Sequence, residues 1–287
     1  SYDLDLLDTE DLVALFTNED IKPQEAVSKA SSEIIKAVDQ ITNRINNQGR
    51  LIYIGAGTSG RLGVLDASEC PPTFCSSHEL IQGLIAGGDK SLRISSESIE
   101  DNVKTSVHDL QSINFNSKDS LVGITAGGTT PYVLSALKYA QKINALAIAI
   151  SCVPKSEAFI DCDLDIRLLT GPELLTGSTR LKAGTATKMT LNIISTSVMI
   201  KLGKVYHNKM VDVSATNSKL IDRSIRIIQD LTDNNRQKSL ELLELAEGSV
   251  KLALLISISG MNVIKARQLL RESDDNLRLA LNKFDSD

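Results

Sequence analysis

The spacing of hydrophobic positions changes near residue 50. Before it, apolar residues recur at helical spacing from about 24 to 46, after a short acidic segment that also predicts a helix. Beyond it, short apolar runs end in small residues and are each followed by helical periodicity; the runs are residues 51–54, 80–86, 121–125, 145–151 and 164–168. Apolar strands that alternate with helices predict a doubly wound α/β domain on a parallel sheet.

The last seventy residues or so show only helical periodicity. Apolar positions repeat in five segments with short polar breaks between them, namely 220–231, 236–245, 249–258, 263–270 and 277–284. We therefore expect three parts: an N-terminal helical segment (1–46), the sheet domain (47–217) and a C-terminal all-helical subdomain (218–287).

Composition narrows the classes of function. The chain has 287 residues, 42% of them hydrophobic and 3% aromatic, and its 31 Lys and Arg against 36 Asp and Glu give a net charge of −5. Such a balance, with no basic stripe, disfavours nucleic acids and anionic membranes as partners. Because no apolar stretch approaches the ~20 residues of a membrane span and the N-terminus lacks a secretory pattern, we expect a cytoplasmic protein.

Cysteines and histidines predict neither a disulfide scaffold nor a metal site. The four cysteines lack Cys-x-x-Cys spacing, and the three histidines lie far apart in the sequence. We expect reduced thiols and no metal. Carboxylates, hydroxyls and backbone groups would then supply any catalytic chemistry.

A glycine-rich turn follows the first predicted strand. The motif G-A-G-T-S-G at 55–60 fits the dinucleotide fingerprint, with Asp89 as a ribose ligand, so an NAD-dependent oxidoreductase stays open. Thr58 and Ser59, however, place two hydroxyls at a helix N-terminus, which favours a phosphate monoester. A tight turn without any ligand is the third interpretation.

Two further polar segments are expected to meet this turn. The motif A-G-G-T-T-P at 126–131 also follows a strand and opens a helix, and carboxyl ends of parallel strands share one edge of the sheet. A third segment adds Ser178, Arg180 and Lys182 before a long helix, where a helix cap with solvated charges is the alternative. The candidate phosphate ligands in the first two loops are Gly57, Thr58, Ser59, Gly127, Gly128, Thr129 and Thr130.

Acidic residues are the remaining candidates for proton transfer. Glu69 lies in D-A-S-E-C-P-P-T at 66–73, where two prolines stop a helix and restrict the orientation of their neighbours. Glu97, Glu100 and Asp101 lie at the start of another predicted helix, where acids also interact favourably with the helix dipole. For Glu69 and for these three acids alike, an exposed carboxylate at a helix end is the alternative.

Together these motifs closely resemble the N-acetylmuramic acid 6-phosphate etherase family. The resemblance rests on residues 51–63 and 66–73 and covers almost the whole chain; it extends through 83–88, 100–102, 130–133, 182–186 and 210–213. It implies the SIS fold of sugar isomerases, with a five-stranded parallel sheet, a homodimer and a phosphosugar site near the subunit interface.

The resemblance also implies an activity. Members cleave the D-lactyl ether at C3 of N-acetylmuramic acid 6-phosphate, giving N-acetylglucosamine 6-phosphate and D-lactate in peptidoglycan recycling. Removal of the C2 proton, elimination and water addition need two acid–base groups but no cofactor. By resemblance, Glu100 removes the C2 proton, and Glu69 protonates departing lactate and then activates water. Charge complementarity alone suggests that Arg180 or Lys182 attracts the lactyl carboxylate.

One loop departs from the family pattern. Members usually read A-S-G-R-T-P at the position of 126–131, so this chain lacks a hydroxyl at Gly127 and a cation at Thr129. A lost charge-assisted hydrogen bond would cost ~1.5–3 kcal/mol, roughly ten- to a hundredfold in affinity, unless Thr129 and backbone N–H groups compensate. A non-catalytic phosphosugar-binding regulator, similar to glucokinase regulatory protein, therefore stays open, although the presence of both Glu69 and Glu100 favours the enzyme.

Overall fold

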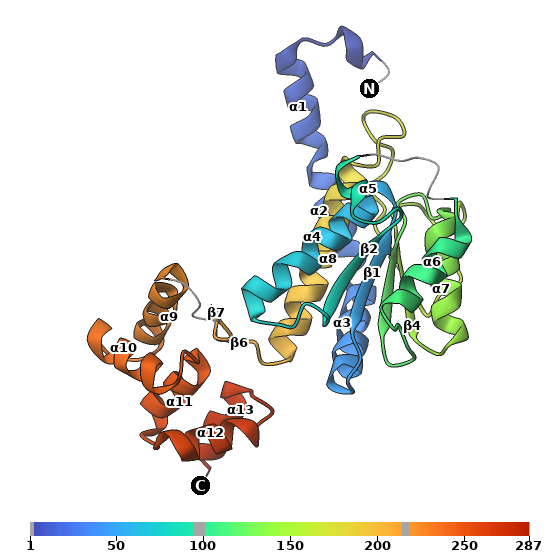
Figure 1. Cartoon of the computed structure of the whole chain (residues 1–287). Coiled ribbons are helices and arrows are strands. Elements are labelled where there is room, and N and C mark those ends of the chain that lie inside the picture. The colour runs from blue at the N-terminus through green and yellow to red at the C-terminus, as the bar shows by residue number, and fades with distance from the viewer. Residues whose placement is uncertain (1–2, 95–100, 214–217, 287) are drawn as a thin grey trace. The chain divides into compact units, whose positions relative to one another are not determined.

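The computed structural model describes residues 3–94, 101–213 and 218–286, and the chain forms two compact units (Figure 1). The first unit consists of Ser1–Ser68 and His78–Thr196, and the second of Glu69–Ser77 and Ser197–Asp287. The expected three-part division of the chain stays a prediction.

A five-stranded parallel sheet forms the centre of the first unit, which confirms the predicted fold class. Its strands are β1 (Leu51–Gly55), β2 (Ile81–Ile85), β3 (Ser120–Ile124), β4 (Leu146–Ser151) and β5 (Leu164–Arg167), in the order β2-β1-β3-β4-β5. Gly55 at the end of β1 is in register with Ile85 of β2 and with Ile124 of β3. The strand order reverses between β1 and β3, so their carboxyl ends form the switch point at which open α/β sheets bind ligands.

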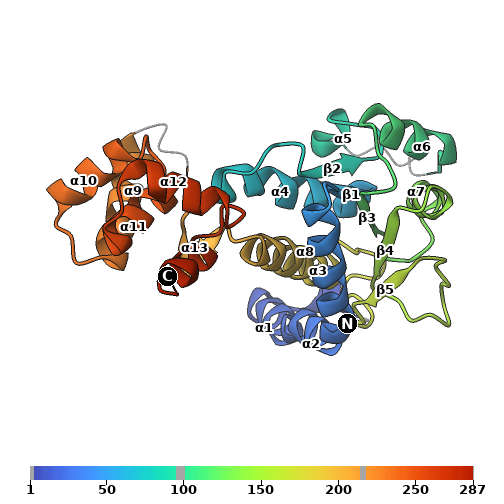
Figure 2. The same ribbon diagram turned by 90° about the horizontal axis from the view of Figure 1, so that it is seen from below.

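Helices cover both faces of the sheet, as Figures 1 and 2 show. Alternate residues of β1 lie on opposite faces of the sheet. Ile52 and Ile54 join a buried cluster with α6 and α7, whereas Tyr53 contacts α4. The helices of this layer arrangement are α3 (Ser31–Asn46), α4 (Gly57–Phe74), α5 (Lys90–Arg93), α6 (Val103–Ser112), α7 (Pro131–Lys142) and α8 (Lys182–Lys201).

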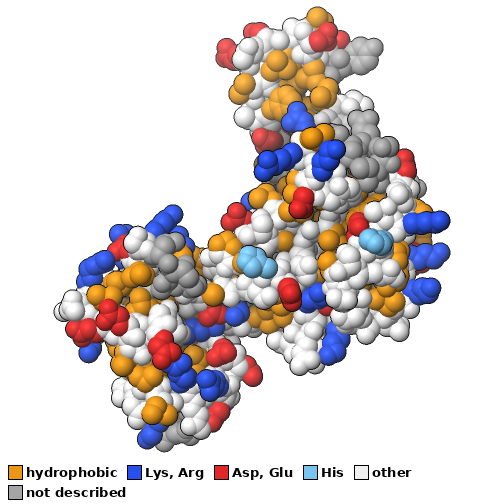
Figure 3. Space-filling view, in the orientation of Figure 1, with side chains coloured by type: hydrophobic (Ala, Val, Ile, Leu, Met, Phe, Trp, Pro, Cys, Tyr) orange, Lys and Arg blue, Asp and Glu red, His pale blue; other side chains and the backbone are white. Residues whose placement is uncertain are grey.

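The N-terminal segment forms a short 3₁₀ turn and then separate helices. After η1 (Leu4–Leu6), α1 (Thr9–Glu19) begins at Asp8, whose carboxylate accepts a hydrogen bond from the N–H of Asp11. The single helix predicted from 24 to 46 is instead α2 (Ile21–Lys29) and α3, which meet at a bend in the backbone at Ala30. Helix α1 buries none of its residues, and Figure 3 shows apolar side chains at the surface over it.

The described part of the second unit contains a small hairpin and a set of helices. The hairpin, which the sequence pattern did not predict, pairs β6 (Val205–Tyr206) with β7 (Lys209–Met210). The five predicted helical segments are observed as α9 (Ser218–Leu231), α10 (Arg236–Leu245), α11 (Val250–Ser259), α12 (Val263–Arg271) and α13 (Leu277–Phe284). Four of these helices start at a residue whose side chain accepts a backbone N–H bond, namely Asn235, Ser249, Asn262 and Asn276.

A buried ion pair fixes the beginning of β1 beside the beginning of β3. The carboxylate of Asp119 is fully buried and accepts hydrogen bonds from Nη2 of Arg50 at 2.7 Å, from Nε of Arg50 at 3.1 Å and from the backbone N–H of Arg50 at 2.9 Å. The backbone N–H of Asn116 donates to the same carboxylate at 3.0 Å. This ion pair thus joins β1 and β3, the strands that precede the candidate loops, at their amino ends, in addition to the hydrogen bonds of the sheet.

Substitution of Asp119 by Ala is expected to lower the free energy of unfolding by about 3 kcal/mol or more, because the guanidinium and two backbone N–H groups lose their buried acceptor. Urea denaturation followed by circular dichroism measures the free energy of unfolding of each variant. Asp161→Ala is the control, since this residue is exposed and its carboxylate accepts a long hydrogen bond of 3.5 Å from the side-chain amide of Gln141. Equal destabilisation by the two variants would contradict the assigned role of Asp119.

Candidate functional site

The turn between β1 and α4 requires glycine at two positions. A Cβ atom on Gly60 would lie 2.6 Å from the carbonyl oxygen of Gly55, and Gly57 has a φ of +53° in the left-handed region. This close approach lets α4 begin immediately after the strand. Thr58 and Ser59 therefore lie half-exposed in the first helical turn, where backbone N–H groups have no partner within the helix.

The turn between β3 and α7 is built in a similar way. Gly128 has a φ of +74°, and a Cβ there would lie 2.7 Å from the Cβ of Ala158. The hydroxyls of Thr125 and Thr130 are 3.0 Å apart, and Pro131 occupies the first turn of α7. This turn leaves Gly127 and Thr129 exposed at the N-terminus of α7.

The third polar segment lies against both turns. A Cβ on Gly184 would be 3.6 Å from Cγ2 of Thr58. Cys152, which follows β4, donates its backbone N–H to the carbonyl of Ala126 at 2.8 Å, and its thiol lies 3.9 Å from the carbonyl oxygen of Ala183. The structure thus brings the two glycine-rich turns and the N-terminus of α8 to one edge of the sheet.

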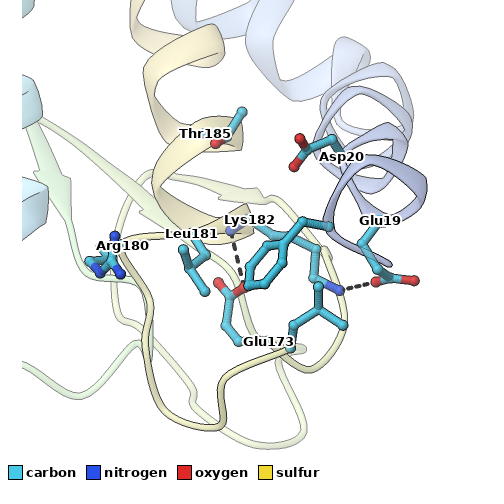
Figure 4. Close-up of a pocket in the computed structure, with 9 residues that line it drawn as sticks. Glu19, Asp20, Glu173, Arg180, Leu181, Lys182 and Thr185 are labelled. Carbon is cyan, nitrogen blue, oxygen red and sulfur yellow. Dashed lines mark hydrogen bonds and ion pairs between the residues drawn. The ribbon is translucent and has the colours of Figure 1, made fainter. Parts of the chain in front are cut away.

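A carboxylate already occupies the N-terminus of α8. The side chain of Glu173 accepts hydrogen bonds from the backbone N–H of Lys182 at 3.0 Å and of Ala183 at 2.9 Å, as Figure 4 shows in part. The ammonium of Lys182 is buried and pairs with the carboxylate of Glu19, at the end of α1, at 2.5 Å. Arg180, Lys182, Glu19 and Glu173 line one cavity of about 270 Å³.

The remaining predicted site residues lie in different surroundings. Ser178 is half-buried and Arg180 is exposed. Glu69 is exposed in the C-terminal part of α4 and belongs to the second unit. Glu100 lies outside the described residues; the described residues that follow it include Asn102, whose side chain caps α6 by accepting from the N–H groups of Lys104 and Thr105.

Sequence reasoning missed three acidic side chains that organise this region. Glu19 and Glu173 hold Lys182, and Asp66 accepts hydrogen bonds from β1 and α8. Glu173 precedes the helix it caps by nine residues, beyond the range of any capping motif. The one usable signal for Asp66 was its place on the apolar side of a helix, where an acid needs hydrogen-bond partners.

Thiol and metal chemistry receive no support from the described residues. Burial raises the pKa of the Cys152 thiol to about 12, so it stays protonated beside the two turns. In the described ranges, no group of three or more His, Cys, Asp or Glu side chains is arranged to hold a metal ion.

Within those same ranges, no helix combines the length and apolar character needed to cross a membrane.

Comparison with known proteins identifies similar chains. Residues 33–141 match the family model described as the glucokinase regulatory protein N-terminal SIS domain. A protein of Parasynechococcus marenigrum (strain WH8102) named N-acetylmuramic acid 6-phosphate etherase is 61% identical, over 96% of this chain and 88% of its own length. One of the same name from Prochlorococcus marinus (strain MIT 9303) is 60% identical, over 97% and 88%.

Solved structures with a similar arrangement are more distant. A phosphoheptose isomerase from Neisseria gonorrhoeae is 18% identical and aligns with a TM-score of 0.48, covering 66% of this chain and 97% of its own. A phosphoheptose isomerase from Francisella tularensis is 16% identical with a TM-score of 0.46, covering 68% and 100%.

The ion pair of Glu19 predicts a pH dependence of stability. The hydrogen bond from Lys182 is the largest cause that lowers the pKa of Glu19 below its ordinary value of 4.5. A lowered folded-state pKa stabilises the fold above the unfolded pKa, and this contribution disappears as the pH falls through the folded-state value. We expect wild type to be more stable than Glu19→Gln at pH 7 and this difference to shrink below about pH 4.5.

Urea denaturation of both proteins between pH 3 and pH 8 measures that difference. Glu10→Gln serves as the control, because Glu10 is an exposed residue of the same helix. A difference between wild type and Glu19→Gln that is the same at every pH would contradict the assignment.

Proposed function

The chain belongs to the N-acetylmuramic acid 6-phosphate etherase family and is an enzyme that cleaves a carbon–oxygen bond; we propose that it converts N-acetylmuramic acid 6-phosphate into N-acetylglucosamine 6-phosphate and D-lactate. The observation that carries this proposal is identity of 61% over 96% of the chain with a protein of that name. Such full-length similarity favours the lyase, and nothing favours the phosphosugar-binding regulator or the NAD-dependent oxidoreductase that the motifs alone left open.

The two glycine-rich turns are the proposed phosphate site. Thr58 and Ser59 would donate hydroxyl and backbone hydrogen bonds from the start of α4. The hydroxyls of Thr129 and Thr130 would donate from the start of α7, where the backbone N–H of Thr130 already donates to the hydroxyl of Thr125. The hydroxyl oxygen of Thr129 lies 3.8 Å from the point where a Cβ on Gly127 would stand. This proximity supports the idea that Thr129 supplies the hydroxyl that family members place at 127.

The proposed chemistry uses two carboxylates in sequence. In the ring-opened sugar, Glu100 takes the C2 proton, and the electron pair of that C–H bond forms the C2–C3 double bond as the C3–O bond breaks. Glu69 gives its proton to the departing lactate oxygen. Glu69 then takes a proton from water that adds to C3, and Glu100 returns a proton to C2, so atoms and charges balance. The exposure of Glu69 on α4 supports access to a ligand.

Recognition of the lactyl carboxylate is proposed for Arg180 or Lys182. Lys182 is buried, and its ammonium is already paired with the carboxylate of Glu19. Arg180 lines the same cavity and has no ion-pair partner within the part of the chain that the structure describes. Arg180 is therefore the more readily available cation.

We further propose that the enzyme acts in the cytoplasm as a homodimer, in the recycling of peptidoglycan sugars. The four cysteines are free thiols, which supports a reducing compartment. The homodimer follows from the family resemblance, and sedimentation of the purified protein tests it.

The division of roles between the two carboxylates gives a direct experiment. In D₂O, uptake of deuterium at C2 of the sugar phosphate is expected to persist in Glu69→Ala and to disappear in Glu100→Ala, whereas both variants are expected to lose release of D-lactate. Proton NMR measures exchange and a coupled enzymatic assay measures lactate. The reverse pattern would exchange the two roles, and lactate release by both variants would refute the proposal.

The altered loop gives a second experiment on the phosphate site. A Cβ at position 127 would meet no described atom closer than the Thr129 hydroxyl oxygen at 3.8 Å, and φ there is not positive. Gly127→Ser is therefore expected to fold normally and to bind the substrate up to about tenfold more tightly by adding a hydroxyl donor. Gly128→Ala is the matched contrast and is expected to weaken binding and stability, because of its φ of +74° and the 2.7 Å approach to Ala158. Calorimetry with N-acetylglucosamine 6-phosphate measures both; unchanged affinity in both variants would place the phosphate elsewhere.

A further inference from the structure

A buried carboxylate on α4 is bonded to the sheet and to α8. Asp66 is 5% exposed, and its Oδ2 accepts a hydrogen bond from the Tyr53 hydroxyl of β1 at 2.9 Å. Its Oδ1 accepts from the side-chain amide of Asn192 at 2.7 Å and from the Ser195 hydroxyl at 3.1 Å, both on α8. One side chain thus ties three elements of the first unit together.

Packing of α4 does not require a carboxylate at this position. The same helix buries Gly60, Gly63 and Ala67 on neighbouring positions, and these residues fill space without side-chain polar groups. A buried carboxylate is costly unless donors surround it, so it is a demanding choice for a packing residue. The Asp66 carboxylate instead fixes the orientation of α4, because its three hydrogen bonds come from two sides and restrict both the rotation and the sliding of the helix.

The restriction acts one helical turn before Glu69. Three residues of α-helix correspond to about 4.5 Å along the axis and about 60° around it, so Asp66 and Glu69 lie close together on α4. Beyond Glu69 the helix is weakened, because Pro71 and Pro72 have no N–H to donate to the carbonyls of Ala67 and Ser68. Asp66 is thus the hydrogen-bonded anchor on the N-terminal side of Glu69, and the buried side chains of Cys70 and Phe74 follow on the other side.

We propose that Asp66 is a positioning residue, whose hydrogen bonds with Tyr53, Asn192 and Ser195 set the rotation of α4 and thereby aim the Glu69 carboxylate at the departing lactate oxygen. The inference rests on the role given to Glu69 in the proposed function. Proton transfer is sensitive to such placement, since a displacement of about 1 Å can reduce a rate about a hundredfold. The C2 proton is assigned to the other carboxylate and does not depend on this anchor.

The two half-reactions therefore separate this role from a merely structural one. Loss of the anchor is expected to slow lactate release while deuterium uptake at C2 continues. General loss of folded protein would lower both rates together. The ratio of the two rates is thus a readout that destabilisation alone does not change.

Removal of single hydroxyls tests the anchor with little risk to the fold. We expect Tyr53→Phe combined with Ser195→Ala to lower lactate release about tenfold or more, with C2 exchange within about twofold of wild type. Asp66→Asn, which keeps the shape but cannot accept from all three donors, is expected to give a larger change in the same direction. Each variant is measured at saturating substrate, with its melting temperature.

Thr190→Val is the matched control. Thr190 lies on α8, is fully buried and donates its hydroxyl to the carbonyl of Ala186 at 2.9 Å, so its replacement removes a buried hydrogen bond without touching Asp66. We expect its melting temperature to fall by about as much as that of the hydroxyl variant. Lactate release and C2 exchange are both expected to stay within about twofold of wild type.

Two results would overturn the inference: equal loss of lactate release and C2 exchange in the hydroxyl variants, or retention of both rates. The variant Glu69→Gln distinguishes failure of the positioning role of Asp66 from failure of the proposed function. If Glu69→Gln still releases lactate at the wild-type rate, the role of Glu69 is wrong, and the positioning role falls with it. If Glu69→Gln loses lactate release but the hydroxyl variants do not, only the positioning role is wrong.

Discussion

The hydrogen-bonded pairing of β1 with β3 is the constraint on which the proposed phosphate site depends. Because Gly55 is in register with Ile124, the two strands end at the same level, and the turns that follow them start side by side. Each turn then begins a helix at once, which the 2.6 Å approach between Gly60 and Gly55 allows in the first turn. The N-termini of α4 and α7 therefore start at the same edge of the sheet, where we propose that they share one phosphate.

The neighbouring N-terminus of α8 serves a different purpose. Glu173 already satisfies its first backbone N–H groups, and Glu19 neutralises Lys182, so this helix start carries no unbalanced positive charge toward a phosphate. The phosphate dianion is thus assigned to the starts of α4 and α7. The cavity at α8, which Arg180 lines, is the proposed position for the carboxylate end of the same substrate.

Much of the fold was predictable because its signals are local. The central strands β1, β3 and β4 are buried on both faces and read as continuous apolar runs, and α10 to α13 begin at Asn or Ser caps. The bend at Ala30 carries no glycine or proline, and the hairpin of β6 and β7 has strands of two residues, too short for a periodic pattern. For the site, the two turns were visible as motifs, whereas Asp66 meets Asn192 and Ser195 across 126 and 129 residues, a pairing that no local pattern encodes.

The charge distribution around the two turns bears on how they would bind a phosphate. Neither turn contains Lys or Arg. Arg61, the cation next to the first turn, donates to the carbonyl groups of Ser91 and Leu92 and so supports α5 rather than a ligand. Phosphate held only by hydroxyls and backbone N–H groups is held by short-range, directional bonds, and its affinity then depends on the shape of the turns more than on charge. For the proposed phosphate site, this accounts for the absence of a cation at Thr129 and for the glycines with left-handed φ at Gly57 and Gly128.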